Sequence, residues 1–122
     1  MDFNDTAEEA AFRAEAHSWL NENATPLAPG EMPRSGLSET NLSESDIAEA
    51  KTWQKTKADA GWACITWPSQ YGGRDATPIQ NVTGNQEEAR YAVPPSLFGI
   101  GQGMLGPTLM AHGTEAQKDR YL

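Results

Sequence analysis

The adjacent carboxylates Glu87 and Glu88 are the residues of this sequence whose types most directly suggest acid–base chemistry. Two carboxylates in different environments can divide the roles of general acid and general base. Neighbouring side chains of a helix, however, point about 100° apart, so these two do not converge on one substrate atom. We therefore predict that neither is catalytic, and that one is a helix-surface charge paired with Arg90 or a lysine.

Other residues with chemical potential are scattered along the chain. His17 and His112 lie far apart and no third ligand cluster accompanies them, so we predict no metal site and expect surface or hydrogen-bonded core histidines. Cys64 is the only cysteine, which excludes an intrachain disulfide and fits a reducing compartment. Arg74 could meet a phosphate, but we expect a solvated charge at the rim of the fold.

A run of glycines carries the strongest structural signal. Gly99, Gly103 and Gly106 recur at the spacing of one helical face, and Pro107 follows directly. Each glycine costs roughly 0.8–1.0 kcal/mol relative to alanine and an interior proline about 3 kcal/mol, so contacts outside the helix must compensate. We predict a continuous, kinked helix; the alternative is a break, with Gly106 and Pro107 starting a short helix. The bare stripe admits either a ligand or the backbone of a neighbouring helix.

Composition limits the possible partners. The net charge of −8 argues against nucleic acid, which requires clustered Lys and Arg. No stretch has the features of a signal peptide or a membrane span, so a soluble, cytoplasmic protein is expected. At 122 residues the chain is long enough for one domain over 1–122 with a real core.

Helix boundaries are indicated by local capping signals. Thr6 with Glu9, and Thr114 with Gln117, form capping boxes that predict one helix over 6–22 and another after Gly113, which we place in a left-handed conformation. The apolar stripe of the first helix is Phe12, Ala16, Trp19 and Leu20.

Two further helices are expected between these. One begins at Ser43 or Ser45 and ends at Gly61, and one begins at Thr77-Pro78 and continues to about Tyr91. The predicted inner face of the latter is Ile79, Val82, Gln86 and Ala89. Residues 24–43 are expected to form a loop, and the aromatic-rich segment 62–73 to anchor on the core. No strand pattern is long enough to predict a sheet, so the fold class is all-α, an orthogonal or up-down helical bundle.

Several short motifs occur together in a recognisable order. They are Phe12-Arg13 before Trp19-Leu20, Gly61-Trp62 before Trp67-Pro68 and Tyr71-Gly72-Gly73-Arg74, Glu87-Glu88, Gly106-Pro107-Thr108-Leu109, Gly113-Thr114, Gln117-Lys118 and Tyr121-Leu122. In order and spacing the chain resembles the N-terminal helical domain of the flavin-dependent acyl-CoA dehydrogenases. The resemblance covers nearly the whole chain and implies a fragment of a longer protein, without the flavin-binding β-domain and the C-terminal helical domain.

The resemblance implies a reaction on an acyl-CoA thioester: a carboxylate removes the α-proton while the β-hydrogen leaves as hydride to FAD. In the family that carboxylate belongs to the C-terminal helical domain, so no catalytic residue and no FAD site are expected here, and the fragment should be inactive alone. The family's acyl slot is walled in part by the residues that match Ser96, Phe98, Gly99, Ile100, Gly103 and Met104. Because glycine widens a slot, we expect a branched, long or polycyclic acyl group.

The implied partners are the acyl-CoA substrate, an electron-transfer flavoprotein or a similar acceptor, and related subunits in a homo- or hetero-oligomer. An acyl-CoA oxidase, or a stand-alone helical protein-interaction module, remains an alternative. We also expect an exposed apolar patch around residues 96–109, where a partner element would lie.

Overall fold

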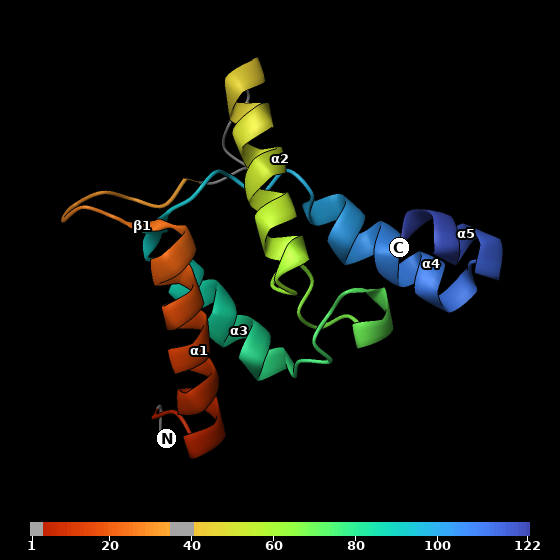
Figure 1. The fold of residues 1–122 in the computed structure, drawn as a ribbon, viewed down its shortest axis with the longest axis horizontal. Helices are drawn as coiled ribbons and strands as arrows, with labels where there is room; N and C mark the ends of the chain where they lie inside the picture. The colour runs from red at the N-terminus through yellow and green to blue at the C-terminus, as the bar shows by residue number, and fades with distance from the viewer. Residues whose placement is uncertain (1–3, 35–40) are drawn as a thin grey trace.

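The computed structural model describes residues 4–34 and 41–122, and within them the fold is helical. Five α-helices carry the chain: α1 (Ala7–Asn23), α2 (Glu44–Asp59), α3 (Pro78–Glu88), α4 (Gly106–His112) and α5 (Glu115–Tyr121). A 3₁₀ turn, η1 (Ser69–Tyr71), and a π-helical segment, η2 (Gly101–Leu105), complete the helical structure. The predicted all-α class is confirmed. In Figure 1, α1 crosses α3 at one end of the molecule while α4 and α5 lie at the other.

The helix starts follow the local capping signals. Thr6, Ser43, Thr77 and Thr114 each accept a hydrogen bond from the backbone N–H three residues on, and that residue's side chain accepts one from the backbone N–H of the cap. Each cap therefore satisfies two backbone donors that a helix start leaves without partners.

One helix end agrees with the prediction and two differ from it. Gly61 has the expected positive φ of 75°, but Gly113 is extended, with φ −70° and ψ 152°, so its predicted left-handed conformation is wrong. Glycine is needed at 113 for a different reason, because a Cβ there would lie 2.6 Å from the carbonyl oxygen of Leu109. The third helix ends at Glu88, earlier than predicted.

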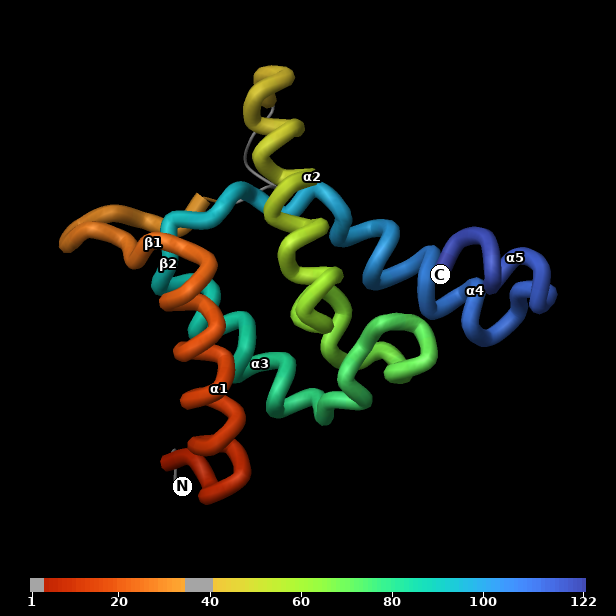
Figure 2. The backbone as a smooth tube through the Cα atoms, in the orientation of Figure 1, coloured from red at the N-terminus to blue at the C-terminus, as the bar shows by residue number. Residues whose placement is uncertain are grey.

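A short antiparallel ladder, which the sequence did not predict, ties the ends of α1 and α3 together. β1 (Thr25–Pro26) pairs with β2 (Tyr91–Ala92), with Thr25 opposite Ala92 and Pro26 opposite Tyr91. Figure 2 shows the two strands side by side where the chain leaves each helix. The ladder fixes the crossing of α1 over α3 at one end.

The core lies between α1, α3 and the segment after α2. Its buried apolar side chains are Phe12, Ala16, Leu20, Ala50, Ile65 and Tyr91. Three of the four residues of the predicted stripe on α1 are therefore buried, and Trp19 is partly buried. At Gly84 a Cβ would make ordinary contacts, 3.4 Å from Ile65 and 3.9 Å from Phe12, so the core does not require glycine at this position of α3.

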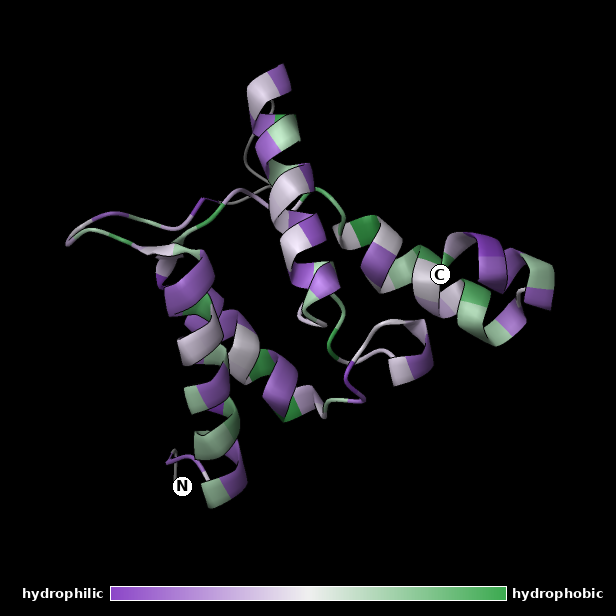
Figure 3. Cartoon of the chain, viewed as in Figure 1, coloured by the Kyte–Doolittle hydropathy of each residue, from purple (hydrophilic) through white to green (hydrophobic). Residues whose placement is uncertain are grey.

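The orientation of α3 differs from the prediction. Ile79 and Val82 are 50% and 47% exposed, whereas Thr83 and Glu87 are each only 2% exposed. The polar residues can face inward because both find partners there: the Thr83 hydroxyl donates to the Ile79 carbonyl at 3.0 Å, and Glu87 is paired by Arg13. Figure 3 shows hydrophilic and hydrophobic residues intermixed along this helix.

The glycine-rich stretch forms one continuous helix over residues 99–112, here called the glycine helix, which contains η2 and α4. The predicted continuous helix is confirmed, and its irregularity is a π-helical segment placed just before Pro107. In Figure 2 it is one uninterrupted tube against which α5 turns back.

Trp67 completes the hydrogen bonding of this helix. The N–H of Gly106 donates to the carbonyl of Gly101, five residues back. In the same register, the donor for the carbonyl of Gln102 would be the backbone nitrogen of Pro107. Proline has no N–H, so this carbonyl has no partner within the helix. The indole Nε1–H of Trp67 donates to Gln102 instead, at 3.2 Å. Its ring lies against bare Gly106, where a Cβ would be 2.2 Å away.

None of the helices formed by residues 4–34 and 41–122 combines the length and hydropathy of a membrane-spanning segment.

Candidate functional site

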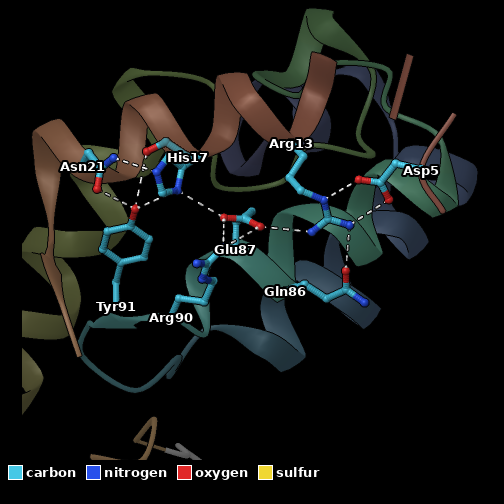
Figure 4. Close-up of polar contacts among 8 residues, drawn as sticks. All are labelled: Asp5, Arg13, His17, Asn21, Gln86, Glu87, Arg90 and Tyr91. Atoms are coloured by element: carbon cyan, nitrogen blue, oxygen red, sulfur yellow. Dashed lines mark hydrogen bonds and ion pairs between the residues drawn. The ribbon is translucent and has the colours of Figure 1, made fainter. Parts of the chain in front are cut away.

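Glu87 is the most buried charged side chain of the described fold, and its surroundings decide whether it acts in chemistry or in structure. Its Oε1 accepts from Arg13 at 3.0 Å, and Arg90 lies 3.3 Å from Oε2. His17 Nδ1 lies 3.4 Å from Oε2 as well (Figure 4). Both oxygens are therefore engaged and the carboxyl is 2% exposed, so it has no access to a substrate proton. Of the two adjacent glutamates, Glu87 makes the expected pair with Arg90 but is buried, while Glu88 is 26% exposed and pairs with a lysine, Lys57.

A hydrogen-bonded ring next to Glu87 joins α1 to Tyr91. The Tyr91 hydroxyl donates to Asn21 Oδ1 at 2.7 Å, and Asn21 Nδ2 lies 3.0 Å from His17 Nε2. His17 Nδ1 in turn lies 3.2 Å from the Tyr91 oxygen, so a proton on Nδ1 satisfies every member of the ring (Figure 4). Burial, and then the charge of Glu87, raise the pKa of Tyr91 and keep its hydroxyl a donor. The cluster is a structural tie.

Arg74 also has a structural role, contrary to the prediction of a solvated charge. Its guanidinium lies 3.8 Å from the centre of the Trp62 ring, and its Nε donates to the carbonyl of Gly61 at 3.0 Å. A third contact, to Glu15 at 2.6 Å, reaches α1. Since its donors are engaged in holding the Trp62 segment against α1, Arg74 is not available as a phosphate site.

The candidate site is a groove between α1, α3, the segment 62–67 and the glycine helix, with a cavity of about 470 Å³. Its volume falls in the range of about 300–1,000 Å³ typical of small-molecule sites. We call it the tryptophan groove. The residues used below, all of which line it, are Trp19, Trp62, Trp67, Lys57, Asn81, Asn85, Glu88, Ser96, Gly99, Gln102 and Gly103.

One wall of the tryptophan groove is aromatic. The rings of Trp19 and Trp62 are stacked, with centroids 5.7 Å apart and planes 29° apart, and Phe12 packs behind Trp62 at 5.6 Å. This wall exists because the first turn after α2 returns segment 62–67 to α1, where the Arg74 guanidinium covers the other face of Trp62. Trp19 also packs against Trp53, with centroids 5.5 Å apart, so the indole faces make protein contacts and the wall offers a ligand an aromatic, apolar lining.

The wall formed by the glycine helix is bare. At Gly99 and Gly103 a Cβ would meet no atom within 4 Å, so the backbone there is open to the groove rather than sealed by another helix. At Gly106 the same face is closed by Trp67. The stripe therefore serves two purposes: its first part faces a cavity, and its last part admits an indole ring.

The six predicted slot residues are only partly brought together. Ser96, Gly99 and Gly103 line the tryptophan groove, while Phe98 faces a second, more apolar cavity of about 550 Å³ beside α5. Ile100 and Met104 are 77% and 66% exposed. Exposed apolar side chains at this end agree with the expected patch around 96–109.

The other half of the groove, which comes from α3 and α2, was not predicted from the sequence. Asn81, Asn85 and Glu88 share a helical face, and that spacing was the available signal. Burial raises the pKa of the Cys64 thiol, which also lines the groove, and so keeps it protonated at neutral pH. Among the residues that the structure describes, no three His, Cys, Asp or Glu side chains lie close enough together to hold a metal ion.

The fold and groove can now be set beside known proteins. The family model of the acyl-CoA dehydrogenase N-terminal domain matches residues 6–122. This chain belongs to that family. The expected resemblance to this family is thereby confirmed.

Relatives of this acyl-CoA dehydrogenase domain match between about half and nine tenths of its length. Acyl-CoA dehydrogenase IpdE1 of Mycobacterium tuberculosis is 34% identical over 111 residues, which cover 91% of this chain and 28% of the relative. Acyl-CoA dehydrogenase FadE29 of the same organism is 38% identical over 58 residues, covering 48% of this chain and 14% of the relative. The domain thus spans less than a third of the length of the curated relatives it matches.

Solved structures agree with the helical arrangement of the acyl-CoA dehydrogenase domain. The ChsE4-ChsE5 complex from Mycobacterium tuberculosis matches with a TM-score of 0.61 and 25% identity, covering 100% of this chain and 28% of that one. The Tcur3481-Tcur3483 steroid ACAD matches with a TM-score of 0.65 and 26% identity, covering 99% and 29%. The names of both structures join two differently named components.

Proposed function

We propose that this domain belongs to a full-length, FAD-dependent acyl-CoA dehydrogenase that introduces a double bond into a bulky, polycyclic acyl-CoA thioester. The family match over residues 6–122 and the relatives' names support the reaction class. The single observation that carries the substrate class is the open backbone at Gly99 and Gly103, which widens the groove where side chains would otherwise fill it. The steroid ACAD among the similar structures supports the same class.

The residues that line the tryptophan groove do not fit the diphosphate of the flavin. The tryptophan groove offers one cation, Lys57, and its ammonium already pairs with Glu88 at 3.0 Å, which leaves no uncompensated positive charge for a diphosphate. FAD, which accepts the hydride in this family, is therefore assigned to the rest of the full-length protein. This domain contributes to catalysis by shaping the acyl site and by excluding water from it.

We further propose that the full-length protein assembles with a related but different subunit. Support comes from the two similar structures whose names join two components, ChsE4-ChsE5 and Tcur3481-Tcur3483. The exposed side chains of Ile100, Met104 and Leu105 offer an apolar surface to domains or subunits packed against the glycine helix.

The test uses the full-length, flavin-loaded protein with its partner subunit. Flavin reduction on anaerobic mixing should give a higher kcat/KM for a polycyclic acyl-CoA than for butyryl-CoA. Gly103→Leu should reduce the polycyclic value by at least about tenfold, because the side chain fills the groove, and change the butyryl value much less.

Gly101→Leu is the matched control, since Gly101 has equally open surroundings but lines the second cavity. A wild-type preference for the short straight chain would overturn the proposed substrate class. So would an equal effect of the two leucine substitutions on the polycyclic thioester.

A further inference from the structure

The part of the tryptophan groove formed by α3 carries polar groups with unused hydrogen-bonding capacity. Asn81, Asn85 and Glu88 follow one face of α3 and line the groove. In the described part of the chain, no side-chain hydrogen bond is made by Asn81 or Asn85, and none reaches Oε2 of Glu88. This row of three residues, here called the acceptor row, therefore presents one anionic acceptor and two amides to whatever fills the groove.

Glu88 is held in a fixed orientation by α2. Its Oε1 accepts the indole N–H of Trp53 at 2.8 Å and the ammonium of Lys57 at 3.0 Å. Because both donors approach the same oxygen, the carboxylate is anchored while Oε2 stays free. Its side chain is 26% exposed and that of Lys57 is 14% exposed, so a ligand in the groove would displace much of the remaining water around them.

The aromatic and polar residues that line the groove impose complementary demands on a ligand. The indole rings of Trp19 and Trp62 favour an apolar ligand surface. The free carboxylate oxygen of Glu88 can only accept hydrogen bonds, so a ligand that covers it without donating leaves it desolvated and unpaired. An apolar ring system with a hydroxyl group meets both demands. A ring ketone would place a second acceptor against the carboxylate.

We propose that the acyl-CoA substrate carries a hydroxyl group on its ring system, and that this hydroxyl donates a hydrogen bond to Glu88 Oε2. Asn85, one helical turn before Glu88 on the same row, hydrogen-bonds the hydroxyl oxygen or an adjacent water. The inference rests on the proposed function, since it concerns the acyl group bound in the same groove. Glu88 is in this account a specificity-determining residue rather than a catalytic one.

The experiment compares three thioesters of one polycyclic skeleton, bearing a ring hydroxyl, a ring ketone or no ring oxygen, on the full-length, flavin-loaded protein with its partner subunit. The wild-type kcat/KM for the hydroxyl compound should exceed each of the other two by about tenfold or more. In Glu88→Gln, whose amide can also donate, the ratio of hydroxyl to ketone should fall at least about tenfold.

Two further variants keep the test decisive. Asn85→Ala removes no protein hydrogen bond, so it should fold normally while lowering the preference for the hydroxyl compound about threefold. Gln86→Ala, on the outer side of α3 where its partner is Arg13, is the control and should leave the ratios unchanged.

The outcomes separate the two proposals. Equal kcat/KM values for the three polycyclic thioesters, or a Glu88→Gln ratio equal to that of wild type, would overturn the hydroxyl assignment while the proposed function stands. Reduction of the flavin by short straight-chain thioesters but by none of the three would overturn the proposed function itself.

Discussion

Replacing Gly106 with alanine should destabilise the protein because the new methyl group enters the space of an indole ring. A Cβ at this position would lie 2.2 Å from Cζ2 and 2.4 Å from Cη2 of Trp67, whereas ordinary contacts are 3.4–4 Å. The backbone at Gly106 is helical, with φ −56° and ψ −56°, so alanine itself is not strained. The cost is therefore the displacement of Trp67 by more than about 1 Å.

The magnitude follows from three contributions. Overpacking costs about 1–3 kcal/mol. Moving the ring also weakens the Trp67–Gln102 hydrogen bond, worth about 1 kcal/mol, while the higher helix propensity of alanine returns about 1 kcal/mol. The net loss in the free energy of unfolding is about 2 kcal/mol. With a typical urea dependence of about 2 kcal/mol per M, the midpoint should fall by roughly 1 M.

Urea denaturation followed by tryptophan fluorescence measures this loss, and Gly103→Ala is the matched control. A Cβ at Gly103 meets nothing within 4 Å, so alanine there should be neutral or stabilise by up to about 1 kcal/mol. If Gly106→Ala were as stable as wild type, or if both substitutions lowered the midpoint equally, the proposed close packing of Trp67 on Gly106 would be refuted.

Three other changes test separate parts of the fold. Glu87→Gln should lower the free energy of unfolding by about 2 kcal/mol, measured by urea denaturation, because Arg13 loses a buried charged partner; a variant as stable as wild type would contradict this role. Hydrogen bonds from Ser43 lower the pKa of Asp46 to about 2 from 3.8, so its contribution to stability is complete above about pH 4 and is lost as the pH falls toward 2. Asp46→Asn should therefore flatten the acid limb of a stability–pH profile, and an unchanged limb would count against the assignment. Thr114→Ala should cost α5 about 1 kcal/mol and speed amide exchange in its first turn, whereas unaltered exchange would show that the cap is dispensable.

Only one wall of the candidate site could be predicted from the sequence. The glycine stripe predicted an open wall at Gly99 and Gly103, because missing side chains are visible in the sequence itself. The facing wall was not predicted. That wall depends on which face of α3 points into the fold. The apolar residues Ile79 and Val82 predicted the wrong face, since both are exposed.

The sequence by itself determined where helices begin. Each start depends on a residue and its partner three positions later, such as Thr6 with Glu9 or Thr114 with Gln117, so the interaction is complete within one turn and needs no tertiary contact. The order of the family's motifs was equally readable, since it is a property of the chain alone.

Tertiary structure alone decided which polar groups could be buried and which glycines stay open. Glu87 faces inward because Arg13, 74 residues away, reaches it from α1, and no local pattern reports a partner at that distance. Gly106 is closed and Gly103 open only because Trp67 is brought to one and not to the other. Burial of a charge and filling of a bare helical face both depend on atoms supplied from elsewhere in the chain, so their outcome is fixed only when the helices pack.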